Sequence, residues 1–263
     1  MRVHVVSDVH GHTEALHRAG DGADAVVVLG DLMNYLDYGD PSQGIIADLV
    51  GSDIGQLFAD LRKEHRFAEL RAAGASALAT LADPTAAIIE AARAQYAALF
   101  DAMPTPAYCT YGNVDIPALW PEFLTEGHRM LDAEVVVLDG WRLGFVGGWP
   151  RRPSGRRRTR PVVPFGADVS EEEYAAKVQA LGEVDVLCSH VPPAVPELCY
   201  DTVSRAFEVA SPALLAAIHR IRPRYALFGH VHQPLQARMR LGRTECVNVG
   251  HFRATGRPFA LSW

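Results

Sequence analysis

Five short apolar segments recur along the chain, and a side chain that can bind a metal ion closely follows each one. Runs of this length that are rich in valine and bounded by glycine or polar residues are typical of buried strands. Ligands of open α/β sheets bind beyond the carboxyl ends of the strands. The sequence therefore predicts a site at one end of the fold, with strand segments VHVVSD ending at Asp8, DAVVVLGD at Asp31, AYCTYGN at Asn113, VDVLCSH at His190 and RYALFGH at His230.

Helices and hairpins are expected between these strands. Residues 12 to 19 follow a helical pattern, Ser170 opens a capping-box sequence, and Ser211 stands directly before a proline, which is a typical helix start. Asp139-Gly140 and Gly242 each separate two strand-like runs, as turn residues of hairpins do. Parallel strands with intervening helices and antiparallel hairpins together predict an α/β (α+β) fold with mixed sheets.

Residues 32 to 104 interrupt this alternation of strands and helices. An irregular start rich in Gly, Asp and Tyr is followed by three helical stretches. We interpret the segment as a helical insertion, or cap, within a single domain that spans residues 1 to 263. The insertion either acts as a lid that sets the size of the substrate or packs against the edge of the sheet.

Composition limits the classes of partner. The formal net charge of -6 and the pI near 6.0 argue against a nucleic-acid polymer as partner. The arginine-rich segment at residues 151 to 160 could bind an anionic substrate or form a solvated loop. The four cysteines form no Cys-x-x-Cys pair, no apolar run is long enough to span a membrane, and no signal segment precedes the first strand. We therefore expect a cytoplasmic protein without a membrane partner.

The polar residues at the strand ends form a set of metal-type ligands. Asp8 and His10 are two apart, so both would point to the same side if the first strand continued through them. Nitrogen and oxygen donors without thiolate suit Mn, Fe(II) or Zn at catalytic sites. The set has seven members, which is too many for one ion and suits two ions that share the Asp31 carboxylate. Its members are Asp8, His10, Asp31, Asn113, His190, His230 and His232.

The order of these motifs resembles that of the calcineurin-like metallophosphoesterase family, with SDVHG (7–11), LGDL (29–32), YGNVD (111–115), SHVPP (189–193) and GHVH (229–232). The resemblance covers nearly the whole chain. It implies a four-layer sandwich of two mixed β-sheets flanked by helices. It assigns Asp8, His10 and His232 to one divalent ion and Asn113, His190 and His230 to the other, with Asp31 bridging. Manganese is the first candidate for both ions, and iron, zinc and nickel are the alternatives.

The resemblance implies hydrolysis of a phosphate ester. Two cations roughly 3.5–4 Å apart would acidify a bound water to a hydroxide, which attacks phosphorus in line with the leaving group. Asp31 and Asn113 are the expected catalytic residues, because Asp31 bridges the ions and Asn113 can also touch the phosphoryl group. We expect His12 and His251 to contact substrate, although His12 could instead cap the helix that follows it.

Val114 departs from the family pattern. Many relatives carry a histidine after the asparagine, and in phosphatases of the family it helps to protonate the leaving group; valine cannot donate a proton. The departure favours a phosphodiesterase over a phosphomonoesterase, and a catalytically inactive protein-binding scaffold of the same fold is the alternative from another class. Scaffold relatives tend to lose metal ligands, whereas this chain keeps the whole set. Asp115 is interpreted as the N-cap of the helix IPALWPEFL.

Overall fold

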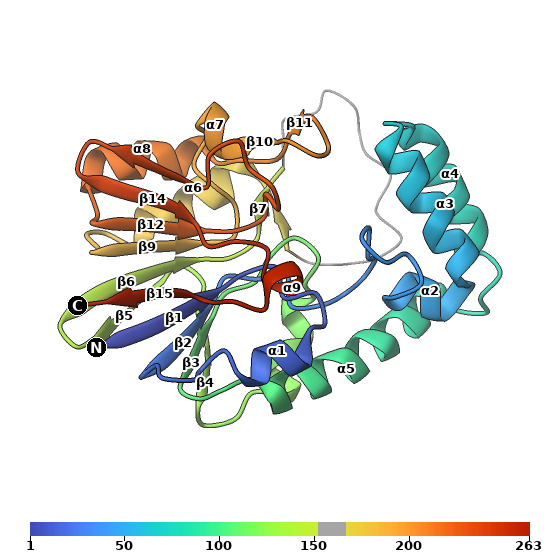
Figure 1. Cartoon of the computed structure of the whole chain (residues 1–263), viewed down its shortest axis with the longest axis horizontal. Coiled ribbons are helices and arrows are strands. Elements are labelled where there is room, and N and C mark those ends of the chain that lie inside the picture. Colours follow the sequence, from blue (N-terminus) through green and yellow to red (C-terminus); the bar gives the residue numbers. More distant parts are fainter. Residues whose placement is uncertain (152–166) are drawn as a thin grey trace.

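A computed structural model describes residues 1–151 and 167–263. Apart from Arg151, the arginine-rich segment at 151–160 lies outside these residues. In the described part of the chain, two larger mixed sheets lie face to face and helices cover their outer faces (Figure 1). The predicted four-layer sandwich is thereby confirmed.

The first sheet has five strands, and β1 lies beside β15, which comes far later in the sequence. Three parallel pairings join β1, β2, β3 and β4, while β15 runs antiparallel to β1 with Arg2 opposite Ser262. The order across the sheet is β15 (Phe259–Ser262), β1 (Arg2–Val6), β2 (Ala25–Val28), β3 (Ala107–Cys109) and β4 (His128–Met130).

The second sheet has six strands and contains both predicted hairpins. Strands β5 and β6 are antiparallel around Asp139-Gly140, and β13 and β14 are antiparallel around Gly242, as the turn residues indicate. Strands β14, β12, β9 and β6 are parallel. The order is β13 (Arg238–Leu241), β14 (Thr244–Asn248), β12 (Tyr225–Phe228), β9 (Val186–Ser189), β6 (Trp141–Val146) and β5 (Glu134–Leu138). Two short pairs stand apart, namely β7 (Trp149–Pro150) with β8 (Asp168–Val169) and β10 (Tyr200–Asp201) with β11 (Ala206–Phe207).

Alternation along the strands explains why the core has separate apolar layers. In β2, Val27 faces the space between the two sheets, while Val26 and Val28 face the helices on the outer side. Side chains of a strand point alternately to its two faces, so valine at every position is what a strand buried on both faces needs. The helices outside the first sheet are α1 (Thr13–His17) and α5 (Pro84–Ala102), and those outside the second are α6 (Glu171–Ala180) and α8 (Pro212–Ile221).

The helix starts predicted at Ser170 and Ser211 are confirmed. Ser170 accepts a hydrogen bond from Glu173 N and completes the capping box of α6, and Ser211 caps α8 by accepting from Leu214 N. Shorter helical elements are η1 (Pro117–Glu122), α7 (Pro196–Cys199) and α9 (Phe252–Thr255). No helix in the described ranges is both long and apolar enough to cross a membrane.

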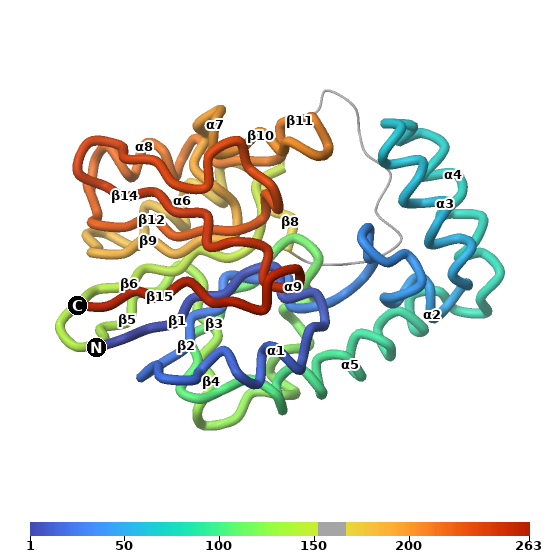
Figure 2. The backbone as a smooth tube through the Cα atoms, in the orientation of Figure 1, coloured from blue at the N-terminus to red at the C-terminus, as the bar shows by residue number. Residues whose placement is uncertain are grey.

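Helices fill most of the segment interpreted as an insertion. The three helical stretches are present as α3 (Ser52–Lys63), α4 (Phe67–Leu78) and α5, and the shorter α2 (Ile45–Val50) lies in the part expected to be irregular. Helices α3 and α4 form a pair to one side of the sheets, whereas α5 runs beneath the first sheet beside α1 (Figures 1 and 2). Among these helices, α5 therefore contributes most to the central core. The assignment of residues 1 to 263 to one domain stays a prediction.

Candidate metal centre

The side chains predicted as metal ligands gather at one end of the two sheets. Each follows the carboxyl end of a parallel strand: β1, β2 and β3 of the first sheet, and β9 and β12 of the second. Helix α9 lies at the same end, and both termini lie at the opposite end (Figure 1). Because the two sheets face each other, their strand ends supply side chains to a common space.

One set of three side chains, here named the first ligand group, consists of Asp8, His10 and His232. Nε2 of His232 is 3.3 Å from Oδ1 of Asp8, and Nε2 of His10 is 3.9 Å from the same oxygen. The two histidine Nε2 atoms are 3.4 Å apart. These donor atoms are close enough to converge on one ion.

The second ligand group consists of Asn113, His190 and His230. Nε2 of His190 is 2.9 Å from Oδ1 of Asn113, and the ring centroids of His190 and His230 are 5.1 Å apart. His190 is completely buried. The group joins the end of β3 in the first sheet to the ends of β9 and β12 in the second.

Asp31 lies between the two groups. Its Oδ2 is 3.5 Å from Nε2 of His190 and 4.0 Å from Nε2 of His10. Its Oδ1 accepts a hydrogen bond from the backbone N–H of Val114 at 3.0 Å. A carboxylate that reaches a histidine of each group is in the position that a bridging ligand requires.

Hydrogen bonds to the outer ring nitrogens orient two of the histidines. Nδ1 of His10 is 3.2 Å from Met33 O, and Nδ1 of His190 is 2.9 Å from Leu29 O. A backbone carbonyl at Nδ1 selects the tautomer that leaves Nε2 free to bind a metal. In both residues, Nε2 then faces Asp31.

Backbone conformation brings several of these side chains inward, and the condition set for Asp8 and His10, that the first strand continue through them, is not met. Strand β1 ends at Val6, so Asp8 and His10 do not lie on one face of a continuing strand. Positive φ angles turn both residues toward the site, at 57° for Asp8 and 42° for His10, and Asp31 and His230 share this conformation at 52° and 68°. Such angles cost energy in residues other than glycine and cluster at functional sites.

Two glycines allow the loops to approach. A Cβ at Gly229 would collide with the side chains of Ser7 and Asp8, and a Cβ at Gly112 would collide with Asp31. The glycine that precedes His230 and the glycine that precedes Asn113 are therefore required by the close packing of the ligand loops.

Asp31 and His190 stabilise each other's charged form in the buried site. Burial favours the neutral form of Asp31, but the charge of His190, its hydrogen bond to Asp31 and the charge of His10 together outweigh burial and lower the pKa of Asp31 to about 2. Burial alone would lower the pKa of His190, but the charge of Asp31, its hydrogen bond with His190 and the charge of Asp8 together raise this pKa to about 9. Burial, together with the charge of His190, lowers the pKa of His230 to about 3. In the metal-free protein Asp31 and His190 thus form an ion pair, and an ion that binds His190 must displace its proton.

Unpartnered buried atoms test whether a metal centre fits these residues. Oδ1 of Asp8 and Nε2 of His230 have no hydrogen-bond partner among the described residues, although both are buried. Donor atoms of Asp8, His10 and Asp31 lie within 4.8 Å of one another, and so do those of Asp31, His190 and His230. Buried polar atoms without partners are rare and costly, and cations would satisfy them. The donor set and its unpartnered atoms therefore fit two divalent ions.

The model of the calcineurin-like phosphoesterases matches residues 1–234 of the sequence. The chain belongs to this family. Hydrolysis of phosphoric esters is the chemistry of the family, and its members typically use divalent metal ions. No curated protein matches the sequence.

Solved structures share the fold at low sequence identity. The crystal structure of TT1561 from Thermus thermophilus aligns with a TM-score of 0.53 and 13% identity, over 99% of this chain and 98% of that one. An archaeal phosphodiesterase aligns with a TM-score of 0.38 and 9% identity, over 97% of this chain and 87% of that one. The first likeness supports the fold alone, and the second is too weak to bear on specificity.

Asp115 has a different role from the one expected of it. The N-cap of η1 is Ile116, and Asp115 does not cap this helix. The completely buried Asp115 instead accepts backbone hydrogen bonds from Asp31 N and Gly112 N, both at 2.8 Å, and from Leu32 N at 3.0 Å. Burial and the charge of Asp31 raise its pKa to about 6. Asp115 therefore fixes the two loops that carry Asp31 and Asn113, and its place in the phosphoesterase motif YGNVD was the available signal.

Arg253, in α9, was not recognised from the sequence. Its guanidinium donates to His10 O at 2.6 Å and to Gln43 Oε1 at 2.8 Å, and it forms an ion pair with the buried Asp37. Its backbone N–H donates to Asp8 O at 3.0 Å. Arg253 thus connects the first ligand group to the loop that follows Asp31, a connection that no local sequence pattern signals.

The two histidines expected to contact substrate have different surroundings. His12 stands at the N-cap of α1 without a capping side-chain bond, and its Nδ1 is 3.1 Å from Arg253 O. The ring of His251 stacks on that of His232 at a centroid distance of 3.8 Å. Burial, followed by the charge of His232, lowers the pKa of His251 to about 4. Both residues border the first ligand group, and substrate contact stays a prediction for each.

The helical segment also reaches this end of the fold. Arg62 of α3 donates to the hydroxyl of Tyr38, at 3.3 Å, and lies 3.6 Å from a carboxylate oxygen of Glu208, just beyond β11. The hairpin of β10 and β11 in turn touches the loop of His232, because Asp201 accepts from Gln233 N at 3.0 Å. Helix α3 is therefore linked both to the loop after Asp31 and to the hairpin beside His232.

Proposed function

We propose that the chain hydrolyses a phosphodiester at a two-metal centre formed by Asp8, His10, Asp31, Asn113, His190, His230 and His232. The position of Asp31 is the observation that supports this most directly. Its Oδ2 lies within 4.0 Å of the Nε2 atoms of both His10 and His190. Two divalent ions held on either side of this carboxylate would supply a nucleophilic water and neutralise the charge of the phosphoryl oxygens.

The residues of the chain have separate tasks in this proposal. Asp31 would hold both ions through its carboxylate, and the Val114 N–H fixes the orientation of that carboxylate by donating to Oδ1. The amide of Asn113 would bind an ion through its oxygen and offer its N–H groups to the phosphoryl group. His12 and His251, beside the first ligand group, contact the ester. Manganese is the first metal to test, followed by iron, zinc and nickel.

Val114 supports a diesterase over a monoesterase. General acid catalysis is typically worth ~10²–10⁴-fold, and valine cannot provide it. The rate should therefore depend steeply on the pKa of the leaving group, and esters with acidic leaving groups should react fastest. If His12 or a residue of the helical segment donates the proton instead, this dependence will be shallow and will steepen when that residue is replaced.

The test uses metal-free protein with Mn, Fe, Ni, Zn or Mg added separately, and measures hydrolysis of aryl phosphodiesters and matched monoesters. The proposal expects metal-dependent turnover that is faster with diesters. Faster turnover of monoesters would identify a phosphomonoesterase. Absence of turnover with every metal, in protein that nevertheless binds two ions, would identify the inactive scaffold. Asp21→Asn, an exposed carboxylate away from the site, is the control for handling of the variants.

A further inference from the structure

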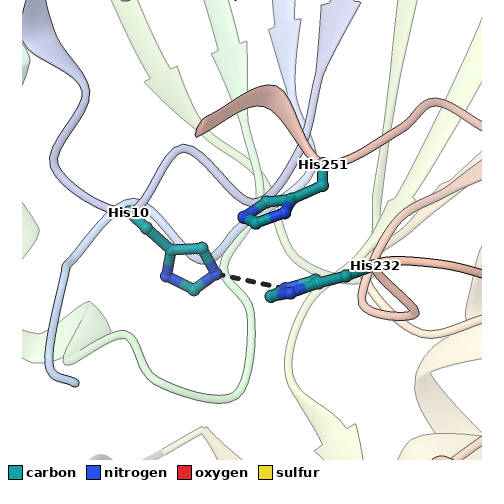
Figure 3. A group of neighbouring side chains, drawn as sticks. All are labelled: His10, His232 and His251. Atoms are coloured by element: carbon teal, nitrogen blue, oxygen red, sulfur yellow. Dashed lines mark hydrogen bonds between the residues drawn. The ribbon is translucent and has the colours of Figure 1, made fainter. Parts of the chain in front are cut away.

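A third imidazole borders the first ligand group. The ring centroid of His251 is 3.8 Å from that of His232, at an interplanar angle of 13°, and 5.7 Å from that of His10 (Figure 3). One ring nitrogen from each of these histidines lies within 4.8 Å of the others. None of the five family motifs in the sequence contains His251.

The nitrogen atoms that face one another in this cluster are not all satisfied by hydrogen bonds. Nε2 of His251 is buried and has no hydrogen-bond partner among the described residues. Nε2 of His10 and Nε2 of His232 face each other at 3.4 Å, where at most one of them can donate. A cation placed among the three rings, beside Oδ1 of Asp8, would contact all three nitrogens at once and would satisfy the Nε2 atom of His251.

The backbone ties His251 to the loop that carries Asp8 and His10. The two residues after His251 donate to this loop, Phe252 N to Ser7 O and Arg253 N to Asp8 O, both at 3.0 Å. The guanidinium of Arg253 donates to His10 O at 2.6 Å. The backbone at His251 is therefore held beside the first ligand group, which keeps the His251 side chain within reach of that group.

We propose that His251 is an additional ligand of the ion that Asp8, His10 and His232 would hold, a role that takes precedence over the contact with the ester proposed for it above. The proposal rests on the metal centre of the proposed function. The ring of His251 is stacked on that of His232, so a rotation of the His251 ring about its side-chain bonds would be needed to direct a nitrogen at the ion.

The additional ligand would make the two ions chemically unequal. The first ion would have three imidazoles and the carboxylates of Asp8 and Asp31. The second would have two imidazoles, one amide oxygen and the Asp31 carboxylate. Imidazole suits Fe, Ni, Cu and Zn, while oxygen ligands suit Mn and Mg. The first position should therefore select a metal later in the first row than the second position does.

Stacking alone is the competing role for His251, and phenylalanine separates the two roles. His251→Phe keeps a flat ring that can stack on His232 but removes both nitrogens. His251→Ala removes the ring as well, and serves if the bulkier substitution disturbs α9. His219→Gln is the matched control, because His219 is exposed on α8 and far from the cluster.

The experiment titrates Co²⁺ into metal-free, full-length protein and records both calorimetric binding and the visible absorption of bound cobalt. We expect wild type and His219→Gln to bind two ions. His251→Phe and His251→Ala should bind one of these ions about 10–100-fold more weakly, with an altered cobalt spectrum for that ion alone. Circular dichroism of the metal-free variants checks that they are folded.

Wild-type affinities and spectra in both folded His251 variants would overturn the proposal. Loss of both ions in His251→Phe would also overturn it, because the second ion does not depend on a His251 nitrogen. Failure of the proposed function gives a different result: wild type that binds both ions yet hydrolyses neither class of ester is not an enzyme, and the variants still decide the role of His251. Wild type that binds no cobalt refutes both.

Discussion

The first and second ligand groups differ in what surrounds them. His190, in the second group, is completely buried, and its two ring nitrogens contact Leu29 O and Asn113. In the first group the side chain of His232 is 35% exposed and that of His10 is 13% exposed. Both groups follow strand ends, but the first group also contacts α9 and the loop after Asp31. The first group is therefore more exposed at His232 and His10 than the second is at His190, and it depends in addition on contacts outside the sheets.

The largest effect is expected at Asp31, which both groups share. Asp31→Asn keeps the shape of the side chain but removes the charge that two ions would share. Turnover with saturating metal should fall by at least about 10³-fold, since even one preorganised electrostatic contact is worth 10²–10³-fold. Steady-state kinetics of Asp31→Asn, compared with those of the Asp21→Asn control, measure this fall in turnover. A variant that keeps full turnover would show that Asp31 does not join the groups.

Asp115 tests the rigidity of the second group. Asp115→Asn replaces an acceptor of several buried backbone N–H groups by a side chain that can point an NH₂ at them. The free energy of unfolding should fall by on the order of 3 kcal/mol, because buried donors are left without acceptors. Chemical denaturation of the metal-free protein measures this, with the exposed Asp101→Asn on α5 as control. A loss no larger than that of the control would mean that the loops of Asp31 and Asn113 are held by other contacts.

Val114 tests the chemistry at the edge of the second group. Val114→His offers a proton donor next to Asn113 and leaves the backbone N–H that binds Asp31 unchanged. Hydrolysis of esters with poor leaving groups should accelerate by up to about 10²-fold, while esters with acidic leaving groups should change little. A series of aryl diesters of graded leaving-group pKa measures the slope. Val137→His, at a valine that is 57% exposed on β5, is the control. An unchanged slope would contradict the role given to the valine.

The smallest effect should come from loosening the first group alone. Arg253→Met removes the guanidinium that donates to His10 O and pairs with Asp37. One of two bound ions should then bind about tenfold more weakly, as happens when groups that orient ligands are lost. Calorimetry beside Arg238→Met, an exposed arginine of β13, separates this from a general effect of charge. Equal weakening of both ions would show that the groups are not independent.

Much of the fold followed from local sequence patterns. Apolar runs predicted β1, β2, β9 and β12 because strands buried on both faces must be apolar throughout. Ser170 and Ser211 marked the starts of α6 and α8 because capping depends on neighbouring residues alone. Asp139-Gly140 located a hairpin for the same reason. These features depend on residues that are close in sequence, so they can be predicted from the sequence alone.

The parts of the site that depend on distant contacts were missed or misread. Asp115 resembled a helix cap because its partners, the amides of Asp31 and Leu32, lie far away in sequence. Arg253 gave no signal because its contacts with His10 and Asp37 arise only when α9 meets the first loop. Asp8 and His10 would share a strand face only if β1 continued through them, and only the folded chain shows that β1 ends at Val6 and that positive φ angles turn both residues inward. Motif order predicted which side chains would meet, but not how the backbone brings them together.

The pairing of β1 with β15 has a consequence for how the protein is made. β1 and the Asp8 loop are synthesised well before α9 and β15, from which more than two hundred residues separate them. The first ligand group therefore cannot be held by Arg253, nor accompanied by His251, until translation has passed both residues. Contacts between residues so distant in sequence form slowly, since a long loop must close first. A nascent chain on the ribosome would consequently present an incomplete site, which should bind the first ion more weakly until α9 and β15 have been synthesised.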